Sequence, residues 1–254
     1  MPTPLPWKTA WVVGASHGIG RAVALRLAAA GVSVAASARD ETALAALASE
    51  ATGSVAAYPM DVTDPDGVET TLAAIEADHG PIDLAVLCAG VWDPFSIDAI
   101  DVAAFRSGIE VNYLGTVNAI ACLVPRMRAR DRGQIAVVSS VAGYFGLPRS
   151  AAYGPTKAAL INLAECLRTE LDGSGVAVSL VNPGFVKTRL TAKNDFPMPF
   201  LMTPDDAADR MVRGLKPGRF EVAFPRRFVL ILKTLGLLPY PLFFWIIRKF
   251  VSRR

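Results

Sequence analysis

The residue types and spacing that could perform chemistry lie in a short stretch of this 254-residue chain. Tyr153 precedes Lys157 by four positions, in a segment (residues 153–171) whose alanine, leucine and glutamate residues favour a helix. Side chains four positions apart share one face of a helix, so the phenol and the ammonium would point into the same space. A cation about 4 Å from a phenol favours the phenolate by up to ~4 kcal/mol, or roughly three pK units. Tyr153 would then exchange protons near neutral pH.

A strand must position the third polar group of this stretch. The apolar residues 135–138 predict a buried strand that ends in Ser139 and Ser140. Ligand crevices in open α/β sheets lie outside the carboxyl ends of the strands, so the Ser140 hydroxyl could hydrogen-bond a substrate oxygen beside Tyr153. A tyrosine followed by a lysine one turn later is common on exposed helices. The preceding strand with its terminal serine is therefore the feature that favours catalysis.

A glycine-rich turn near the amino terminus predicts a nucleotide site. The β-prone residues 9–13 lead into Gly14, Gly18 and Gly20, and residues 22–30 favour a helix. Gly14 would allow a tight turn, Gly18 would let the backbone approach a pyrophosphate, and Gly20 would let helix and strand pack closely. The amino terminus of the helix would then face the phosphates.

Together these motifs resemble the short-chain dehydrogenase/reductase family, whose GxxxGxG turn and Ser, then Tyr-x-x-x-Lys, pattern both stand here. The resemblance covers residues 14–188 and implies catalytic roles. Tyr153 would exchange the proton, and Lys157 would lower the phenol pKa and hold the nicotinamide ribose. Ser140 would orient the carbonyl, and Asn112 would hold a water that relays protons to Lys157.

The expected fold is a single doubly wound α/β domain, a mainly parallel sheet with helices on both faces. Residues 1–224 would form a Rossmann-like, NADP-binding oxidoreductase domain, and residues 225–254 an apolar, basic tail. Strands are expected at residues 9–13, 32–37, 55–58, 82–87, 135–138, 176–181 and 220–224. Helices are expected at residues 22–30, 41–51, 102–130 and 153–171, and further helices would start near Asp64 and Pro204.

Arg39 bears on the choice of cofactor. Folds that prefer NAD usually place a carboxylate just after the second strand to bind the ribose 2′-hydroxyl. Here Ala38 and Arg39 follow residues 32–37, and a guanidinium suits a 2′-phosphate through paired charge-assisted hydrogen bonds. Ser16 and His17 could add contacts. The alternative is that Arg39 is a solvated residue at a helix start, but we predict NADP(H) over NAD(H).

The family resemblance assigns further residues to the cofactor. It places Asp61, Val62 and Val111 at the adenine, although Asp61 could simply be a turn residue. Cys88 stands where the family commonly has an asparagine that braces the sheet. An ordinary turn is the alternative reading of Pro183 and Gly184. The complete predicted cofactor set is Gly14, Ser16, His17, Gly18, Ile19, Gly20, Arg39, Asp61, Val62, Cys88, Ala89, Gly90, Val111, Tyr153, Lys157, Pro183, Gly184, Val186 and Thr188.

An irregular apolar segment, residues 190–202, occupies the place of a substrate lid in the family. Its phenylalanine, proline and methionine residues would suit a lipophilic substrate. Alternatively, these side chains simply pack the lid against the body. Four aromatic residues could add to the pocket wall: Trp92, Phe95, Tyr144 and Phe145.

Composition limits the remaining possibilities. The chain is 52% apolar with a net charge of +3, yet residues 222–254 hold seven basic residues and no acidic one, leaving 19 basic and 23 acidic residues elsewhere. This distribution argues against nucleic-acid binding by the body. Cys88, Cys122 and Cys166 lack metal-ligand spacing, so we expect no metal site and reduced thiols in a cytoplasmic protein. Residues 1–8 are too short and polar to resemble a secretory signal.

The tail, residues 228–251, is apolar for long enough to reach across a bilayer. Lys233 and the Pro239-Tyr240-Pro241 break divide it into two short segments. Basic residues at both ends would suit a segment lying on an anionic membrane, on its inner face. The alternatives are that it caps the pocket or packs in a subunit interface. By resemblance we expect a homodimer or homotetramer joined through the helices of Asn112 and Tyr153.

The sequence therefore predicts an NADP(H)-dependent oxidoreductase that interconverts a ketone or aldehyde and the alcohol, with a lipophilic substrate. The alternative from another class is a catalytically idle NADP(H)-binding regulatory or scaffold protein. The complete set of Asn112, Ser140, Tyr153 and Lys157 argues against that alternative, because a binding module does not need all four. Cys88 is the one departure that favours it.

Overall fold

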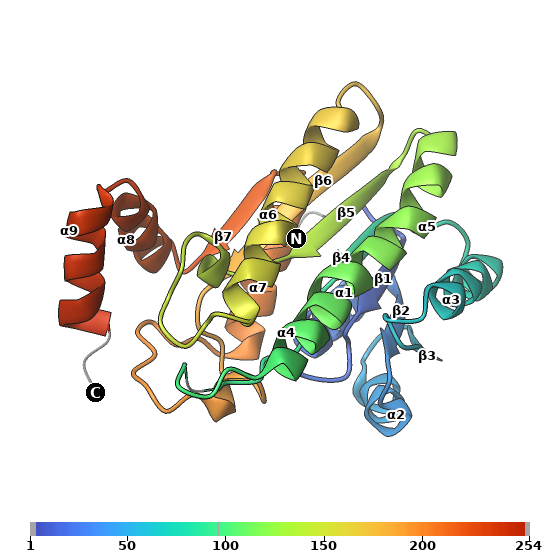
Figure 1. The fold of residues 1–254 in the computed structure, drawn as a ribbon. Helices are drawn as coiled ribbons and strands as arrows, with labels where there is room; N and C mark the ends of the chain where they lie inside the picture. The colour runs from blue at the N-terminus through green and yellow to red at the C-terminus, as the bar shows by residue number, and fades with distance from the viewer. Residues whose placement is uncertain (1–3, 96, 252–254) are drawn as a thin grey trace.

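A computed structural model describes residues 4–95 and 97–251. Its centre is a seven-stranded sheet in the order β3-β2-β1-β4-β5-β6-β7, and every neighbouring pair is parallel (Figure 1). The order reverses between β1 and β4, which makes a crevice at the carboxyl ends of these strands. The strands are β1 (Thr9–Val13), β2 (Ser33–Ala38), β3 (Val55–Pro59), β4 (Leu84–Leu87), β5 (Gly133–Val138), β6 (Val176–Pro183) and β7 (Glu221–Phe224).

Helices cover both faces of the sheet, as Figure 1 shows. The prediction of a doubly wound α/β fold is confirmed, and the predicted strands match the observed ones to within about two residues. The helices are α1 (Gly18–Ala29), α2 (Glu41–Glu50), α3 (Pro65–His79), α4 (Val102–Gly108), α5 (Gly115–Ala129), α6 (Tyr153–Glu170), α7 (Pro204–Leu215), α8 (Arg226–Gly236) and α9 (Tyr240–Ile246).

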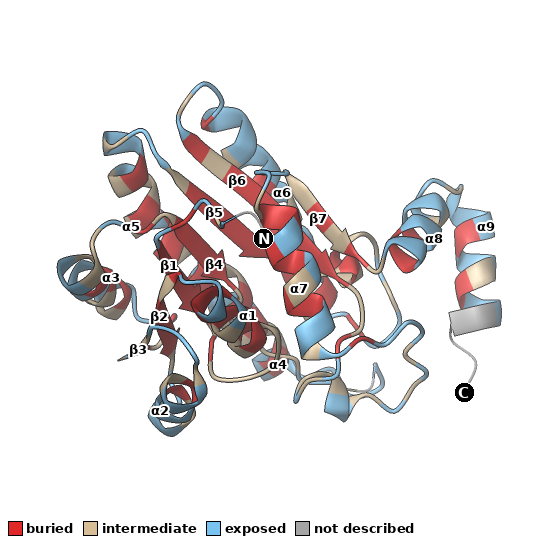
Figure 2. Ribbon diagram, turned by 180° about the vertical axis from the view of Figure 1, so that it is seen from behind, coloured by how far each residue is buried: buried red, intermediate tan, exposed pale blue. Residues whose placement is uncertain are grey.

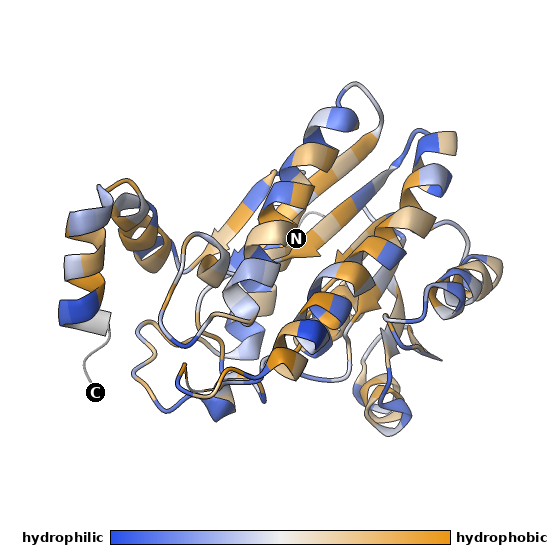
Figure 3. Cartoon of the chain, in the orientation of Figure 1, coloured by the Kyte–Doolittle hydropathy of each residue, from blue (hydrophilic) through white to orange (hydrophobic). Residues whose placement is uncertain are grey.

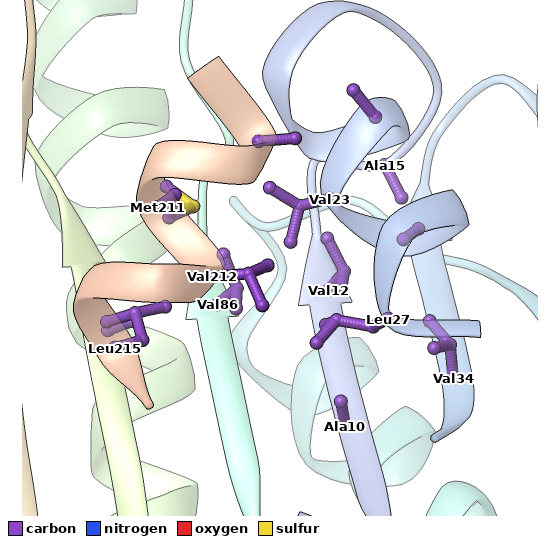
Figure 4. Close-up of a cluster of buried hydrophobic side chains, with 14 of the residues drawn as sticks. Ala10, Val12, Ala15, Val23, Leu27, Val34, Val86, Met211, Val212 and Leu215 are labelled. Atoms are coloured by element: carbon purple, nitrogen blue, oxygen red, sulfur yellow. The ribbon is translucent and has the colours of Figure 1, made fainter. Parts of the chain in front are cut away.

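Two hydrophobic cores follow from the alternation of side chains along the strands. In β1, Val12 points into the core beneath α1 and α7, while Trp11 points into the core beneath α3, α5 and α6. Figure 4 shows the first core, where Leu27 and Val212 meet over Val12. Because both sheet faces are covered, the central strands are buried throughout (Figure 2). This rigid sheet positions the polar groups at its carboxyl edge.

The helical region predicted at residues 102–130 is confirmed, but it is not a regular α-helix throughout. It divides into α4, a π-helical turn (η1, Ile109–Leu114) and α5. Gly115 lies so close to Val62 that a Cβ atom would sit 2.6 Å from the valine Cγ2. Turns of π-helix are rare and mark sites where one residue is inserted into a helix, often at functional positions.

The tail divides where the prolines predicted. α8 ends at Gly236, α9 starts at Tyr240 after Pro239, and a π-helical turn (η4, Ile247–Val251) continues it. Figure 3 shows apolar and polar residues mixed on both helices, which lie beside the β7 edge of the sheet. No helix formed by residues 4–95 and 97–251 is long and apolar enough to cross a membrane. Two basic residues assigned to the tail, Arg253 and Arg254, lie outside the described residues.

Candidate active site

Ser140 lies at the carboxyl end of β5, where the chain turns into a short 3₁₀ helix (η2, Val141–Gly143). Its Oγ accepts a hydrogen bond from the Ala142 amide (3.1 Å) and donates to the Pro183 carbonyl (3.4 Å). The hydroxyl also acts to lower the pKa of Tyr153, which places it near the phenol. The two residues that the sequence predicted to act on a carbonyl therefore lie in the same part of the crevice.

The first turn of α6 is fastened to β5. The buried Ser139 hydroxyl donates to the Lys157 carbonyl (2.7 Å), and the Lys157 Nζ donates to the Val138 carbonyl (3.1 Å). Gly143 packs against the same turn, where a Cβ atom would lie 2.7 Å from the Lys157 carbonyl carbon. These contacts hold the lysine side chain in the crevice, where it is only 4% exposed.

The predicted effect of Lys157 on Tyr153 is not found. Burial raises the pKa of Tyr153 to about 12, and only the Ser140 hydrogen bond acts to lower it. The Lys157 Nζ lies 5.5 Å from the centroid of the phenol ring and is bound to the Val138 carbonyl, so it does not neutralise the phenolate oxygen. Burial also lowers the pKa of Lys157 to about 8.

Asn112 braces the crevice from the π-helical turn. It is fully buried, its Oδ1 accepts from the Val91 amide (2.7 Å), and its Nδ2 donates to the Val91 carbonyl (3.1 Å) and to the Thr156 hydroxyl (3.1 Å). It thereby links the chain after β4 to α6, next to Lys157. The inserted residue of η1 aims the amide inward at this point. The contacts found for Asn112 are these, and not one to Lys157 itself.

Cys88, Ala89 and Gly90 form the floor of the crevice after β4. Burial raises the pKa of the Cys88 thiol to about 11, against the opposing effects of the Lys157 charge and of a hydrogen bond from the Gly20 amide. A thiol therefore lies where the family has an asparagine. A Cβ atom on Gly90 would lie 3.3 Å from the Asn112 Oδ1 and 3.7 Å from the Lys157 Nζ, so a glycine keeps this space open.

The glycine turn has the shape that a dinucleotide requires. Gly14 (φ 86°) crosses β4 so closely that a Cβ atom would lie 2.6 Å from the Ala89 nitrogen. Gly18 (φ 58°) faces Thr188, with 2.9 Å between the position of its missing Cβ and the threonine Cγ2. No side chain caps α1 at His17, so the Gly18 and Ile19 amides at the start of the helix remain available to an anion. These backbone features fit the pyrophosphate of a nicotinamide dinucleotide.

Arg39 and Asp61 lie together after β2 and β3. Their side chains form an ion pair at 3.8 Å, with the arginine 67% exposed. Asp61 also accepts hydrogen bonds from the Thr63 amide (2.9 Å) and hydroxyl (2.8 Å). Burial acts to raise the pKa of Asp61, but these bonds and the Arg39 charge outweigh it and hold the pKa below its usual value. Asp61 therefore begins a turn, and its contact with the adenine stays a prediction.

A further cation was missed by sequence reasoning. Burial and then the charge of Arg189 lower the pKa of His17, which places Arg189 near the glycine turn. The one available signal was its position directly after Thr188, a residue already predicted to bind the cofactor. Ser16 and Ile19, also predicted, lie half-buried in the same turn.

The remaining predicted cofactor residues fall into two groups. Val62 is buried and packs beside the half-buried Val111 in the core beneath α5. At the other end of the crevice, the buried Val186 bridges to Met202, and the Gly184 amide donates to the Phe224 carbonyl (2.7 Å). Pro183 contributes the carbonyl that accepts from Ser140.

A small pocket lies beside Asn112 and Tyr153. The residues that line it are Val91, Trp92, Asp93, Ala104, Gly108, Asn112, Ala152 and Tyr153. Of the four aromatic residues predicted for the wall, Trp92 alone lines this pocket, edge-on to Tyr153 at 5.6 Å between ring centroids. Phe95 instead packs on Phe105, Phe145 packs on Phe243 of α9, and Tyr144 hydrogen-bonds Glu221.

The lid, residues 190–202, packs against the body through aromatic rings. Phe196 contacts Phe185 (6.0 Å between centroids), and Phe200 contacts Phe228 of α8 (5.8 Å). Phe185 and Phe228 stack at 5.7 Å and complete a cluster of four rings. The alternative that these residues pack the lid is therefore what the contacts show, and the rings still form an apolar surface beside Gly184.

A parallel sheet with a glycine cradle at one end of its crevice and a serine–tyrosine pair at the other defines a class of nicotinamide-dependent oxidoreductases. The sequence model described as short chain dehydrogenase matches residues 8–197. The chain therefore belongs to the short-chain dehydrogenase/reductase family, as the motifs predicted, and the fold of this family binds nicotinamide cofactors. Among residues 4–95 and 97–251, no three histidine, cysteine or acidic side chains gather as metal ligands would.

Individual relatives agree with this assignment. An uncharacterized oxidoreductase of Myxococcus xanthus is 40% identical over 242 residues, which cover 94% of this chain and 96% of the relative. The crystal structure of a short-chain dehydrogenase from Streptomyces avermitilis is 27% identical, covers 89% of this chain and 92% of that one, and superposes with a TM-score of 0.81. A closed serine dehydrogenase complexed with NADP+ is 25% identical, covers 86% and 95% of the two chains, and has a TM-score of 0.78.

A further structural neighbour shares the fold alone. A short-chain dehydrogenase/reductase of Burkholderia phymatum in complex with NAD is 22% identical, with a TM-score of 0.83 over 91% of this chain and 93% of that one. Since one neighbour holds NADP+ and another NAD, the family fold accommodates both cofactors.

Proposed function

We propose that this protein is an NADP(H)-dependent oxidoreductase that interconverts a ketone or aldehyde and the corresponding alcohol. The observation that carries the proposal is the convergence of Ser140, Tyr153 and Lys157 at the carboxyl end of β5, where the Lys157 Nζ lies 5.5 Å from the centroid of the phenol ring and the Ser140 hydroxyl acts to lower the phenol pKa. A bound nicotinamide would supply or accept the hydride. Ser140 would hold the carbonyl oxygen, and Tyr153 would donate a proton to that oxygen during reduction or remove it during oxidation.

The supporting residues keep this geometry. Lys157 would hold the nicotinamide ribose with a buried amine whose pKa of about 8 leaves it mostly protonated at neutral pH. Asn112 would fix Val91 and α6 relative to each other, and the pocket between them would exclude bulk water. The glycine turn, with Gly14, Gly18 and the free amides of α1, would receive the pyrophosphate.

The test is the substitution Tyr153→Phe, assayed with a panel of lipophilic ketones and alcohols by the absorbance of NADPH. We expect turnover to fall by at least ~10²-fold, the low end for loss of a general acid, while NADPH still binds. Near wild-type turnover in this variant would refute the assignment. A wild-type protein that binds NADPH but turns over no member of the panel would favour the idle scaffold alternative. The raised pKa of Tyr153 and the presence of Cys88 in place of the family's asparagine also favour that alternative.

NADPH is preferred because cations gather where its 2′-phosphate would lie. Arg39 follows β2, where a carboxylate would mark an NAD enzyme, and Arg189 lies near the adjoining glycine turn, where its charge lowers the pKa of His17. The ion pair with Asp61 leaves the Arg39 guanidinium largely exposed, so its other donors face solvent. Comparing kcat/KM for NADPH and NADH tests this preference directly.

A lipophilic substrate is supported by the ring cluster of the lid. Phe185, Phe196, Phe200 and Phe228 contact one another beside the nicotinamide end of the crevice. An alkyl or aryl substituent on the carbonyl would replace ring–ring contacts with contacts of the same kind, whereas a charged substituent would be desolvated there. The panel should therefore favour long or aromatic carbonyls over short acidic ones.

The tail is proposed to associate with an anionic membrane surface. Its helices expose apolar side chains at Leu230, Ile231, Leu237, Leu242, Phe244 and Trp245. Four exposed basic residues accompany them: Arg226, Arg227, Arg248 and Lys249. Apolar and cationic groups on the same short helices suit the interface of an anionic bilayer, which draws in the first and attracts the second.

Co-sedimentation with vesicles rich in phosphatidylserine tests the membrane proposal. We expect the protein to sediment at low salt and the variant Leu230→Ser/Ile231→Ser to sediment less. The matched control is Ile97→Ser/Ile100→Ser, which removes two equally exposed apolar residues far from the tail in sequence. Protein that stays in the supernatant at low salt would contradict the proposal and leave the tail as packing.

Self-association is proposed through α5 and α6, as in other members of the family. Ile109 and Leu114, which flank the Asn112 turn, are exposed and apolar. Light scattering after size-exclusion chromatography would decide among monomer, dimer and tetramer.

A further inference from the structure

A carboxylate outside the predicted site gathers three donors from three segments. Glu221, the first residue of β7, accepts hydrogen bonds at Oε1 from the Tyr144 hydroxyl (2.9 Å) and from the Asn182 Nδ2 (3.1 Å). Its Oε2 forms an ion pair with Lys233 of α8. The Lys233 Nζ also lies 5.5 Å from the centroid of the Tyr144 ring. We call these four residues the Glu221 cluster.

Two members of the Glu221 cluster adjoin the catalytic serine. Tyr144 follows the 3₁₀ turn that Ser140 begins and caps. Asn182 directly precedes Pro183, whose carbonyl accepts the Ser140 hydrogen bond. The segment carrying Ser140 and the segment leading to Gly184 are thus joined through one carboxylate as well as through their direct contact.

The third connection is to the tail. Lys233 connects α8 to the Glu221 cluster. Phe228, earlier on the same helix, packs over Gly184, where a Cβ atom would lie 3.0 Å from the phenyl Cδ1. Val141, next to Ser140, packs with Phe228, Val229 and Leu232 in a small apolar cluster. The tail helix therefore rests on both segments that would surround a carbonyl substrate.

The charge and exposure of the Glu221 cluster indicate that it positions the segments around it more than it stabilises the fold. Burial acts to raise the pKa of Glu221, but the hydrogen bonds from Lys233, Tyr144 and Asn182 outweigh it and keep the pKa below its usual value. The carboxylate is consequently charged at neutral pH. Because the Lys233 side chain is 48% exposed, the ion pair adds little to global stability.

One atom in the Glu221 cluster is unsatisfied. Among the described residues, the Asn182 Oδ1 is buried with no hydrogen-bond partner, although its Nδ2 is bound to Glu221. A buried acceptor without a hydrogen bond is costly. The orientation of Asn182 is therefore fixed by the bond from its Nδ2 to the Glu221 carboxylate and not by its Oδ1.

We propose that Glu221 and Lys233 are positioning residues that couple the tail helix α8 to Ser140 and to the nicotinamide end of the crevice. This inference rests on the proposed carbonyl reductase activity. Without the carboxylate–ammonium pair, α8 loses its polar connection to β7 and no longer holds the group that accepts from Tyr144 and Asn182, so the Ser140 turn can shift relative to the Gly184 segment. Small displacements of a catalytic group of this kind cost up to about a hundredfold in rate.

The experiment compares Lys233→Met and Glu221→Gln with the wild-type protein on the best carbonyl of the panel. We expect kcat to fall about tenfold in both, with the Kd for NADPH changed by less than about threefold. Tm should shift by only a few degrees because the Lys233 side chain is 48% exposed and solvent screens the pair. Lys233→Arg should restore kcat, and the double variant should lose no more than either single one, since both act through the same contact.

The control and a second readout keep the inference separable from the proposed activity. Arg219→Met removes an exposed cation two residues from Glu221 and should behave as wild type. Amide hydrogen exchange, which needs no substrate, should accelerate at residues 141–145 and 184–188 in Lys233→Met and not at residues 18–29. If the wild-type protein is inactive, the proposed function fails while the exchange data still test the cluster. Unchanged exchange in those two segments, or unchanged kcat in both variants, overturns the inference.

Discussion

The two ends of the crevice are shaped by different parts of the chain, one by the backbone and the other by side chains. The end proposed to bind the cofactor depends on backbone: Gly14 and Gly18 have no side chains, so β1, β4 and the Thr188 segment can approach one another. The substrate end depends on side chains, with rings from the β6 loop, the lid and α8 packed together. The glycine turn depends on absent side chains and tolerates no added atom, whereas side chains in the ring cluster can repack around a substitution. We therefore expect substitutions at the first end to abolish binding and those at the second to change selectivity.

The strongest test of this contrast is Gly14→Ala. Its Cβ would lie 2.6 Å from the Ala89 backbone nitrogen, at a φ of 86° that side chains rarely adopt. Neither strand can move without disturbing the sheet, so we expect no measurable NADPH binding by fluorescence and a lower Tm. Gly146→Ala is the matched control, because no atom lies within 4 Å of its added Cβ. A Gly14→Ala protein that binds NADPH as wild type would remove the distinction between the two ends.

At the opposite end, Phe228→Ala should alter substrate choice. The substitution removes the ring that contacts both Phe185 and Phe200 while leaving the glycine turn intact. We expect kcat/KM for bulky lipophilic carbonyls to fall about tenfold, since a buried aromatic contact is worth roughly 1 kcal/mol or more. The Kd for NADPH should stay the same. Equal losses for large and small carbonyls would mean that the ring supports the fold and not the selectivity.

Arg39→Ala should have an effect of similar or smaller size on cofactor choice. Losing one charge-assisted contact to a 2′-phosphate at this exposed arginine costs about 1.5 kcal/mol, the low end for such contacts, so kcat/KM for NADPH should fall about tenfold. The value for NADH, which lacks that phosphate, should hardly change. Arg168→Ala is a suitable control, because this exposed arginine pairs with Asp172 on α6, away from the crevice. A preference for NADH that Arg39→Ala leaves untouched would reverse the cofactor assignment.

The mildest expected difference concerns the thiols. Burial raises the pKa of both Cys88 and Cys122 to about 11, whereas Cys166 is exposed. The thiolate is the reactive form, so Cys166 should react first with iodoacetamide at pH 8. Labelling of Cys88 should increase about tenfold per pH unit until the pH approaches its pKa. Rapid loss of Cys88 in peptide mass spectrometry at pH 7 would show instead that its thiolate is stabilised at the crevice.

Sequence reasoning was most successful where one local pattern dictates the backbone. The alternation and apolarity of residues 9–13 and 135–138 identified buried strands, and the proline break located the division between α8 and α9. It predicted the helical region at residues 102–130 but not the π-helical turn within it, because nothing in the local helix signal reveals that Gly115 must pack against Val62 from another segment.

Side-chain partnerships across the fold were harder to foresee. Spacing brought Tyr153 and Lys157 to one face, but it could not show that Lys157 would turn to the Val138 carbonyl. Likewise, Tyr144 reads as a pocket aromatic until Glu221, 77 residues away, supplies its acceptor. Contacts of this range depend on which strands become neighbours, and that is settled by the sheet and not by any short motif.

Asn182 offers a choice to anyone who engineers this protein for heat resistance. Its buried oxygen has no hydrogen-bond partner among the described residues, and a buried acceptor left unpaired costs about 1–3 kcal/mol. We expect that a smaller apolar side chain at this position would remove that cost and raise the melting temperature. It would also release Glu221 from one of its donors, so the more durable protein should be the slower one.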